Sequence, residues 1–357
     1  MASRWMLCGI LGGLLTGIAV AQPATVLPRF DTAGDISNFY LIDLTDGDVE
    51  LVDRLQTTAL RARKLPQNLF ELAGRNQAAR PGELFLLPLH RGDGRVDAAL
   101  YVETGIGYVA YIDDLGRSND TIGDEYTSMV GRPFGGIAVD GDPGYVLIGR
   151  RLSNETSIGA FLFHGPSGRA LYLPDLDDRP AEASTTETTD LPTITRPVTA
   201  IIQDYNEQTL GAVVLDPTSG TFHRFTVSER GDRLSAAPIG PNLFDVFAQD
   251  GQAAGEGRFM LLPIFDRLAT LNVLVLDRAT GTAALLTDVR AADTTSRLVP
   301  LSGGVGGPIG EGTLAPYVDN NRTRGAWLFA DNAVRYLDLE SDETTLRSFP
   351  VIVDRGN

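Results

Sequence analysis

Short apolar runs, separated by turns rich in Gly, Asp and Asn, cover most of this chain. One pattern recurs six times: an apolar run, a turn with Asp or a small polar residue, and a second apolar run. The residues that precede the six runs are Asn38, Ala98, Gly159, Gly211, Asn272 and Gly325, at intervals of about 60, 61, 52, 61 and 53 residues. A regular interval of this size, with several strands in each unit, is typical of repeat architectures.

Each repeat is predicted to hold four antiparallel strands. In the clearest repeat they are expected at residues 134–142, 145–149, 160–163 and 169–174, and in a second at 242–251, 259–264, 273–277 and 282–287. A third repeat begins at 68–72 and continues at 84–89. Branched and aromatic runs between such turns favour antiparallel strands. No segment after residue 21 has a sustained helical period, so an all-β fold is expected.

The two chain ends carry the main topological evidence. The first repeat has clear strands only near Phe39 and Val49, whereas the last repeat is followed by an extra strand at 349–357. That strand resembles 134–142 and is predicted to supply the innermost strand of the first repeat. The fold class predicted is therefore a six-bladed β-propeller of four-stranded antiparallel blades, closed by pairing N- and C-terminal strands in one blade. Seven blades, or an open sandwich, are the alternatives.

Two turns support this fold class through a resemblance. The segments 216–220 and 277–281, Asp-Pro-Thr-Ser-Gly and Asp-Arg-Ala-Thr-Gly, resemble the turns of bacterial β-propellers of the TolB and YVTN-repeat type. The resemblance covers most of the chain after residue 21. It implies the fold and no particular activity, because one fold hosts many functions.

The first residues are predicted to be a secretory signal peptide. Arg4 supplies a positive start, residues 6–20 form an apolar run, and residues 19–21 form a small-x-small cleavage site before Gln22. The predicted domains are thus 1–21, signal peptide, and 22–357, a single propeller that is periplasmic or secreted and has no transmembrane anchor after cleavage. An uncleaved anchor is the alternative. Cleavage would remove Cys8, the only cysteine, so no disulfide or thiol chemistry is expected.

The charge balance excludes some partners. The chain has 46 acidic and 30 basic residues, for a formal net charge of −16. Such a field repels phosphate backbones and anionic membranes, so nucleic acid is not an expected partner. The three histidines limit general-base and metal chemistry, and no nucleophile-elbow or zinc-protease motif occurs. The sequence therefore favours binding over catalysis.

Two connections depart from the repeat. The Thr-rich segment 181–197 is predicted to be a mobile surface insertion, with a lid over one face as the alternative. The Gly-rich segment 303–310 is predicted to take the place of the innermost strand of the last blade, where glycines let backbones approach closely.

Polar residues at the ends of the predicted second strands form the candidate ligand-binding set. They differ from blade to blade, as expected for a binding surface, although drift on a solvated rim would give the same variation. The set comprises His90, Arg150, Arg151, Asp204, Tyr205, Asp266, Arg267, Asp319 and Asn320.

Acidic turns form a second candidate set. Carboxylates that converge on a propeller axis would suit Ca²⁺, a hard cation with oxygen ligands. The same residues are also ordinary β-turn formers. The candidate metal ligands are Asp140, Asp142, Asp250 and Asp354.

These observations predict an exported scaffold that binds a protein partner or a small ligand in the bacterial envelope. A Ca²⁺-dependent hydrolase of the lactonase or phytase type, using the mouth of the central channel, is the alternative. A dehydrogenase with a quinone cofactor is a third hypothesis, which the shortage of histidines disfavours.

Overall fold

The structure, a computed structural model, describes residues 24–31, 33, 35–73, 84–90, 96–106, 108–113, 125–129, 144–152, 157–174, 186–206, 208–247, 259–267, 269–302, 309, 312–330, 333–339 and 346–355. The predicted signal peptide, 1–21, lies outside these residues. Within them the regular structure is almost entirely β-strand. No helix in this part of the chain combines the length and apolar character needed to cross a bilayer.

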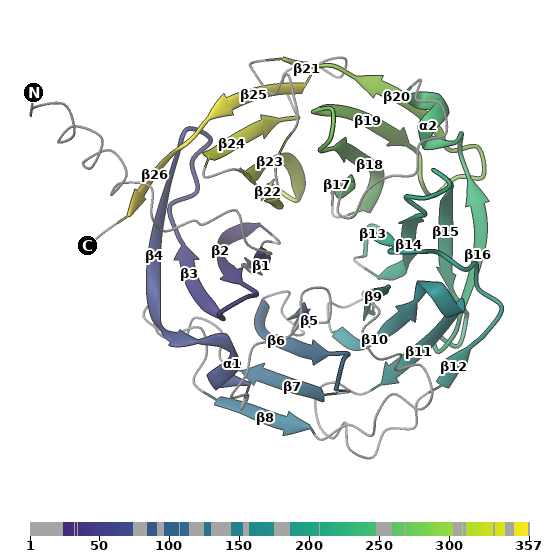
Figure 1. Cartoon of the computed structure of the whole chain (residues 1–357), viewed down its shortest axis with the longest axis horizontal. Helices are drawn as coiled ribbons and strands as arrows, with labels where there is room; N and C mark the ends of the chain where they lie inside the picture. Colours follow the sequence, from purple (N-terminus) through teal and green to yellow (C-terminus); the bar gives the residue numbers. More distant parts are fainter. Residues whose placement is uncertain are drawn as a thin grey trace, which may run out of the picture.

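The described strands fall into six antiparallel groups of four, arranged around one centre (Figure 1). The first three groups are β1 (Ala24–Phe30), β2 (Ile36–Asp43), β3 (Asp48–Val52), β4 (Ala59–Asn68); β5 (Leu84–His90), β6 (Val96–Glu103), β7 (Tyr108–Asp113), β8 (Glu125–Met129); and β9 (Tyr145–Arg151), β10 (Ser157–His164), β11 (Arg169–Pro174), β12 (Thr186–Thr188). The last three are β13 (Val198–Gln203), β14 (Thr209–Leu215), β15 (Phe222–Val227), β16 (Leu234–Ile239); β17 (Phe259–Asp266), β18 (Ala269–Asp277), β19 (Thr282–Thr287), β20 (Thr295–Val299); and β22 (Gly312–Asp319), β23 (Arg322–Ala330), β24 (Ala333–Asp338), β25 (Leu346–Pro350). The first strand of each group lies nearest the centre and the fourth lies outside, so the predicted propeller architecture is confirmed.

The order of strands within each blade differs from the prediction by one position. The segments 145–149, 160–163 and 169–174 are strands, but they are the first, second and third of their blade, and the fourth is β12. The six recurring apolar runs are therefore the second strands. The strand predicted at 134–142 lies outside the described residues. The inner strand of the last blade is β22 and not 303–310, of which 303–308 and 310 are outside the described part.

Two segments predicted as strands are short helices. The prediction for 68–72 is wrong because α1 (Leu69–Leu72) forms there, and 242–251 begins with α2 (Leu243–Val246). In both cases an asparagine caps the helix: Asn68 Oδ1 accepts from Phe70 N at 2.9 Å, and Asn242 Oδ1 accepts from Phe244 N at 2.9 Å. Asn is among the best N-cap residues, and the cap satisfies a backbone donor that a strand would have paired.

The two chain ends meet in the sheet of the first blade, as predicted, but the C-terminal strand joins the outer edge of that sheet and not the inner edge. The N-terminus itself supplies the inner strand, β1. The extra strand, β26 (Ile352–Arg355), pairs in parallel with β4 on the outside of the first sheet (Figure 1). Because β25 is the outer strand of the last blade, the chain leaves it at the rim, where β4 offers the nearest free edge. Likewise β21 (Leu301–Ser302) adds to the outside of β25.

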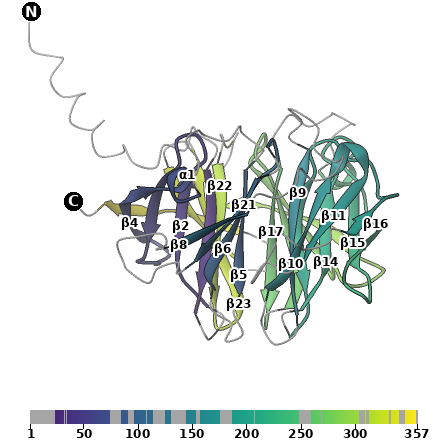
Figure 2. The ribbon, with the colours of Figure 1, turned by 90° about the horizontal axis from the view of Figure 1, so that it is seen from below.

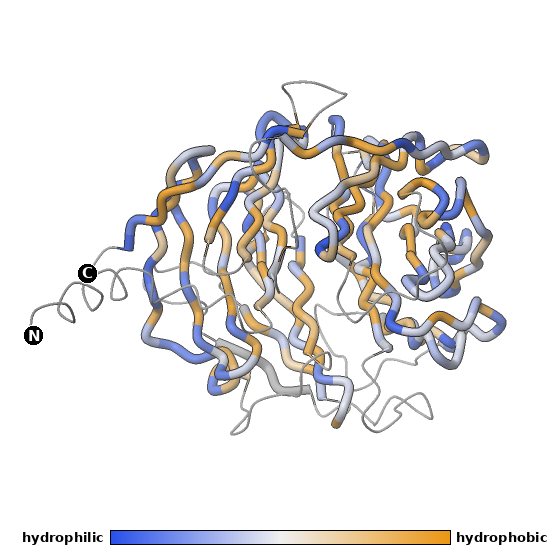
Figure 3. The backbone as a smooth tube through the Cα atoms, turned by 45° about the horizontal axis from the view of Figure 1, so that its top comes forward, coloured by the Kyte–Doolittle hydropathy of each residue, from blue (hydrophilic) through white to orange (hydrophobic). Residues whose placement is uncertain are grey.

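The core lies between neighbouring sheets rather than inside any one of them. Five apolar clusters fill the interfaces around the ring. Along β2, Phe39 and Leu41 pack toward the last blade, whereas Tyr40 and Ile42 pack toward the second. Since side chains alternate along a strand, burial on both faces requires a continuous apolar run. Figure 3 shows the resulting hydrophobic strands and more hydrophilic turns.

The Thr-rich segment is not the surface insertion that was predicted, at least over its described part, 186–197. Residues 186–188 form β12, the outer strand of the third blade, and pair with β11. Leu191 and Ile194 are buried in the cluster between the third and fourth blades. The physical reason is that two apolar residues in this polar segment fill an inter-blade gap, which outweighs its turn-forming composition.

A buried hydroxyl at the start of each of four second strands links neighbouring blades. The backbone N–H groups of His90, Arg151, Gln203 and Phe265 donate to Ser157 Oγ, Thr209 Oγ1, Thr270 Oγ1 and Thr323 Oγ1, at 2.9, 3.0, 3.1 and 2.9 Å. Each donor belongs to the first strand of the preceding blade. The four hydroxyls therefore connect each blade from the second to the fifth with the blade that follows it. In the first two blades the equivalent positions of the second strand hold Ile36 and Val96, which have no hydroxyl.

We expect Thr270→Val to lower the free energy of unfolding by about 1–3 kcal/mol, the cost of leaving a buried polar group unsatisfied. Thr270 is fully buried, accepts from Gln203 N and donates to Ile201 O at 3.0 Å. Valine keeps the shape and removes both hydrogen bonds. Chemical denaturation measures the effect, with Thr270→Ser as the control that keeps the hydroxyl. Equal stability of the two variants would contradict the role of the hydroxyl.

The closing sheet also contains a half-buried carboxyl group. Glu50 lies on β3, and its Oε2 atom accepts no hydrogen bond within the described structure. Burial raises the pKa of Glu50 to about 7; Arg355 and Lys64 act to lower this pKa, and Asp48 acts to raise it. The folded protein therefore keeps a proton that the unfolded chain releases at its ordinary pKa of 4.5. The associated stability is greatest below pH 4.5 and is lost as the pH rises through about 7.

Glu50→Gln is accordingly expected to stabilise the protein above pH 7 by at most about 3 kcal/mol, and to change little below pH 4.5. The measurement is the free energy of unfolding at several pH values. Glu71→Gln, at an exposed position of α1, is the matched control. A gain that did not vary with pH would contradict the titration of Glu50.

Candidate functional site

The predicted ligand-binding residues lie on one face of the ring, because they end the first strands of the blades or directly follow them. His90, Arg151 and Asp266 end β5, β9 and β17, and Asp204 follows β13. In a four-stranded antiparallel blade, the turn after the first strand and the turn after the third emerge on the same face. We call this the hairpin face. Figure 2 shows the ring from the side, with both of its faces edge-on.

Four members of the set have partners in their own hairpin or in the hairpin of the next blade. Asp204 Oδ1 accepts from Asn206 N and Gln208 N at 2.8 and 2.9 Å, which fixes the β13–β14 turn. Arg322 Nε lies 2.7 Å from Asp266 Oδ1, at the point where β17 pairs with β23. Asp319 Oδ2 accepts from Asn320 Nδ2 at 2.8 Å. These contacts hold the face in shape.

The remaining members occupy different environments. The ring of His90 lies 5.3 Å from that of Phe30, in the neighbouring blade. Arg151 is buried, whereas Tyr205 is 54% exposed. Arg267 has a φ of 49°, which places it at the tip of the β17–β18 turn. Arg150 lines a pocket, which is described below.

The structure describes one of the four candidate metal ligands, Asp354. Asp140, Asp142 and Asp250 lie outside the described residues. Asp354 lies on β26, at the outer rim, and not at the mouth of the ring as predicted, because the C-terminal strand pairs with β4. Within the described part of the chain, no group of three or more His, Cys, Asp or Glu side chains is placed to hold a metal ion.

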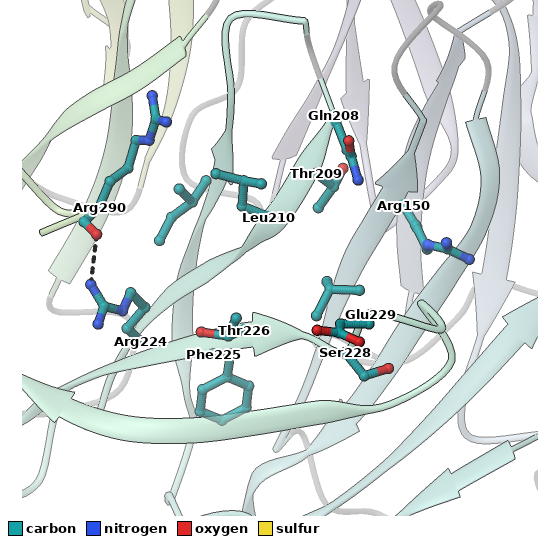
Figure 4. Close-up of a pocket in the computed structure, with 12 residues that line it drawn as sticks. Arg150, Gln208, Thr209, Leu210, Arg224, Phe225, Thr226, Ser228, Glu229 and Arg290 are labelled. Carbon is teal, nitrogen blue, oxygen red and sulfur yellow. Dashed lines mark hydrogen bonds between the residues drawn. The ribbon is translucent and has the colours of Figure 1, made fainter.

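A pocket of about 530 Å³ opens on the hairpin face, at the end of the fourth blade. It lies where the β13–β14 turn and the β15–β16 turn diverge, and residues of the third and fifth blades flank it (Figure 4). Ile202, Leu210, Phe225 and Val227 supply apolar surface. Its volume lies within the range typical of small-molecule sites.

Three half-buried arginines dominate the polar lining of the pocket. Arg150 Nη1 donates to Tyr172 Oη at 2.9 Å, and Arg224 Nη1 donates to the carbonyls of Arg290 and Ala291 at 2.9 and 2.7 Å. The guanidinium carbon of Arg290 lies 5.4 Å from the ring centroid of Tyr205. No described carboxylate forms an ion pair with any of the three.

The sequence interpretation missed both the pocket and the inter-blade hydroxyls. Gln208, Arg224, Glu229 and Arg290 line the pocket, and their turns carry no distinctive motif. The hydroxyls did leave a signal, since Ser or Thr occurs two residues before the anchor glycine or asparagine in the last four repeats, at positions 157, 209, 270 and 323. Their spacing of 52, 61 and 53 residues repeats that of the apolar runs.

The architecture defines the class of protein: in the described residues, six four-stranded antiparallel groups around one centre form a β-propeller. No protein-family model and no curated protein sequence matches the chain. Similar solved structures include a streptogramin B lyase (10% identity, TM-score 0.44, 88% of this chain and 79% of that chain) and an auxiliary nutrient binding protein from Bacteroides ovatus (10%, 0.49, 88% and 69%). Another is a candidate 6-phosphogluconolactonase from Bacteroides uniformis (11%, 0.45, 92% and 85%).

Proposed function

We propose that this protein is an exported propeller scaffold that binds a small anionic ligand in the pocket of the fourth blade. The observation that carries the proposal is the placement of three arginines, 150, 224 and 290, around one pocket of a chain with a formal net charge of −16. Their charges oppose the net negative field of the molecule, so they favour the binding of anions at this place.

The contacts of the three arginines support this proposal. A half-buried guanidinium that pairs with no carboxylate among the described residues has lost part of its hydration and has gained no ion pair there in return. Each guanidinium carries five donors, and Arg150 and Arg224 use only one nitrogen each in the contacts described. Arginine binds carboxylate and phosphate oxygens through two parallel hydrogen bonds. An anion in the pocket would therefore restore the lost interactions.

The test is a thermal melt of residues 22–357 with increasing inorganic phosphate or succinate. A ligand at a hundredfold excess over its Kd adds about 2.7 kcal/mol of stability, so the melting temperature is expected to rise. Replacing both Arg150 and Arg290 with Gln is expected to remove most of the rise. Arg347→Gln, on the exposed side of β25, is the surface control. The proposal fails if no anion raises the melting temperature, or if the pocket variant and the control respond alike.

Export has its own test. Arg4, the apolar run and the small residues at 19–21 support processing before Gln22. Expression of the full chain in a bacterium, followed by N-terminal sequencing of the periplasmic fraction, is expected to give a protein that begins at Gln22. Recovery of the unprocessed chain in the cytoplasm would exclude export.

A further inference from the structure

The positive charges of the pocket lie on two opposite sides of it. In Figure 4, Arg150 stands at one side, and Arg224 and Arg290 stand at the other, with Leu210 and Phe225 between them. Arg150 belongs to β9 of the third blade, whereas Arg290 follows β19 of the fifth. The end of the whole fourth blade separates the two sides, so one compact anion would contact only one of them.

Both sides are held in position by the protein. On the first side, a Cβ added to Gly231 would lie 1.8 Å from Arg150 Nη2, so the guanidinium packs directly on the β15–β16 turn. Arg150 also lies over the ring of Tyr172, at 5.6 Å from its centroid. On the second side, the two carbonyl contacts hold Arg224. Groups that are already ordered lose little entropy when a ligand binds.

The surface between the two sides is mainly apolar. Ile202 is buried beneath it, and Leu210 and Val227 are half-buried. This stretch suits a hydrocarbon spacer, which gains by leaving water. Gln208 and the exposed Glu229 are the polar groups besides the arginines and hydroxyls.

We infer that the ligand is a dicarboxylic acid, with one carboxylate on Arg150, the other on the side where Arg224 and Arg290 stand, and an apolar spacer across the fourth blade. This inference rests on the proposed function and specifies its ligand. A singly charged carboxylate matches the single guanidinium of the first side, because the two planar groups pair through two hydrogen bonds. The carboxylate of Glu229 adds a negative charge to the pocket, which opposes the denser charge of a phosphate more strongly.

Isothermal titration calorimetry with succinate, glutarate, adipate and pimelate tests this inference, with butyrate and hexanoate as single-acid controls. At least one diacid is expected to bind about tenfold or more tightly than the monoacid of equal length, with an optimum in spacer length. Arg150→Gln or Arg290→Gln should bring the diacid down to the affinity of the monoacid. Glu229→Gln should strengthen diacid binding, because it removes a like charge.

The possible results distinguish the diacid ligand from the more general proposal of an anion-binding pocket. If monoacids, or inorganic phosphate, bind the unaltered protein as tightly as every diacid while the arginine variants abolish binding, the pocket takes a single anion; the diacid inference is then wrong and the proposed function stands. If no anion responds to the arginine variants, both are wrong. A diacid preference that Arg150→Gln and Arg290→Gln each remove supports both.

Discussion

Replacing Trp327 with alanine is expected to lower the free energy of unfolding by about 3–5 kcal/mol, the usual cost of truncating a buried aromatic side chain to alanine. Trp327 is fully buried on β23 of the last blade. Its ring lies 5.9 Å from that of Phe39 on β2, in the first blade, and 5.0 and 5.7 Å from those of Tyr317 and Tyr336. It therefore fills the interface at which the ring closes.

The loss of stability should depend on the side-chain volume removed at position 327 and not on a lost hydrogen bond. Trp327 Nε1 has no hydrogen-bond partner within the described structure. Trp327→Phe keeps an aromatic ring and loses no such bond, so it should cost clearly less than alanine. Denaturant unfolding of the two variants measures the difference. A loss below about 1 kcal/mol for Trp327→Ala would mean that strand β26, rather than the apolar interface, carries most of the closure.

Gly211→Ala is the second substitution with a large expected effect, at least about 3 kcal/mol, because clash and backbone strain act together. Gly211 has a φ of 154°, and a Cβ there would lie 1.8 Å from the carbonyl oxygen of Phe225. The clash involves backbone, so no side-chain rotation can relieve it. Strand β14 would have to separate from β15 at the pair Gly211–Thr226.

Gly240→Ala is the matched control for this prediction. Gly240 has a φ of +62°, but the nearest atom to its added Cβ is 3.4 Å away. Its alanine variant should lose only about 1 kcal/mol, from the left-handed backbone alone. Because Phe225 and Thr226 line the pocket, Gly211→Ala should also weaken ligand binding, and Gly240→Ala should not. Equal losses of stability would show that β14 and β15 separate at little cost.

The ring of blades could be predicted because burial on both faces leaves a strong local signal. The second strands, such as β10 and β14, pack against a neighbouring blade on each side and are continuously apolar. First and fourth strands carry weaker patterns. For this reason the predicted position of each strand in its blade was wrong by one: the strands predicted as second, third and fourth are the first, second and third. The fourth strand β20, with two exposed residues among its five, was not predicted as a strand.

The helices α1 and α2 illustrate why local sequence was ambiguous. Leu-Phe followed by an acidic residue suits a buried strand and a buried helical turn equally well over four residues. The preceding asparagine decided the outcome, because its side chain caps the helix in both places. The helices also contact earlier turns: Leu69 N and Leu243 N donate to the carbonyls of Gly47 and Gly220 at 2.9 and 2.8 Å, and a Cβ added to either glycine would clash with Asn68 or Asn242.

The sequence by itself determined the all-β class, the repeat and the apolar second strands, since these depend on residues close together in the chain. Tertiary structure decided which edge of the first blade the C-terminal strand joins, because that depends on which edge lies within reach after β25. It also decided the pocket. Arg150, Arg224 and Arg290 come from three different blades, and only the packing of neighbouring blades around the ring makes them line one pocket.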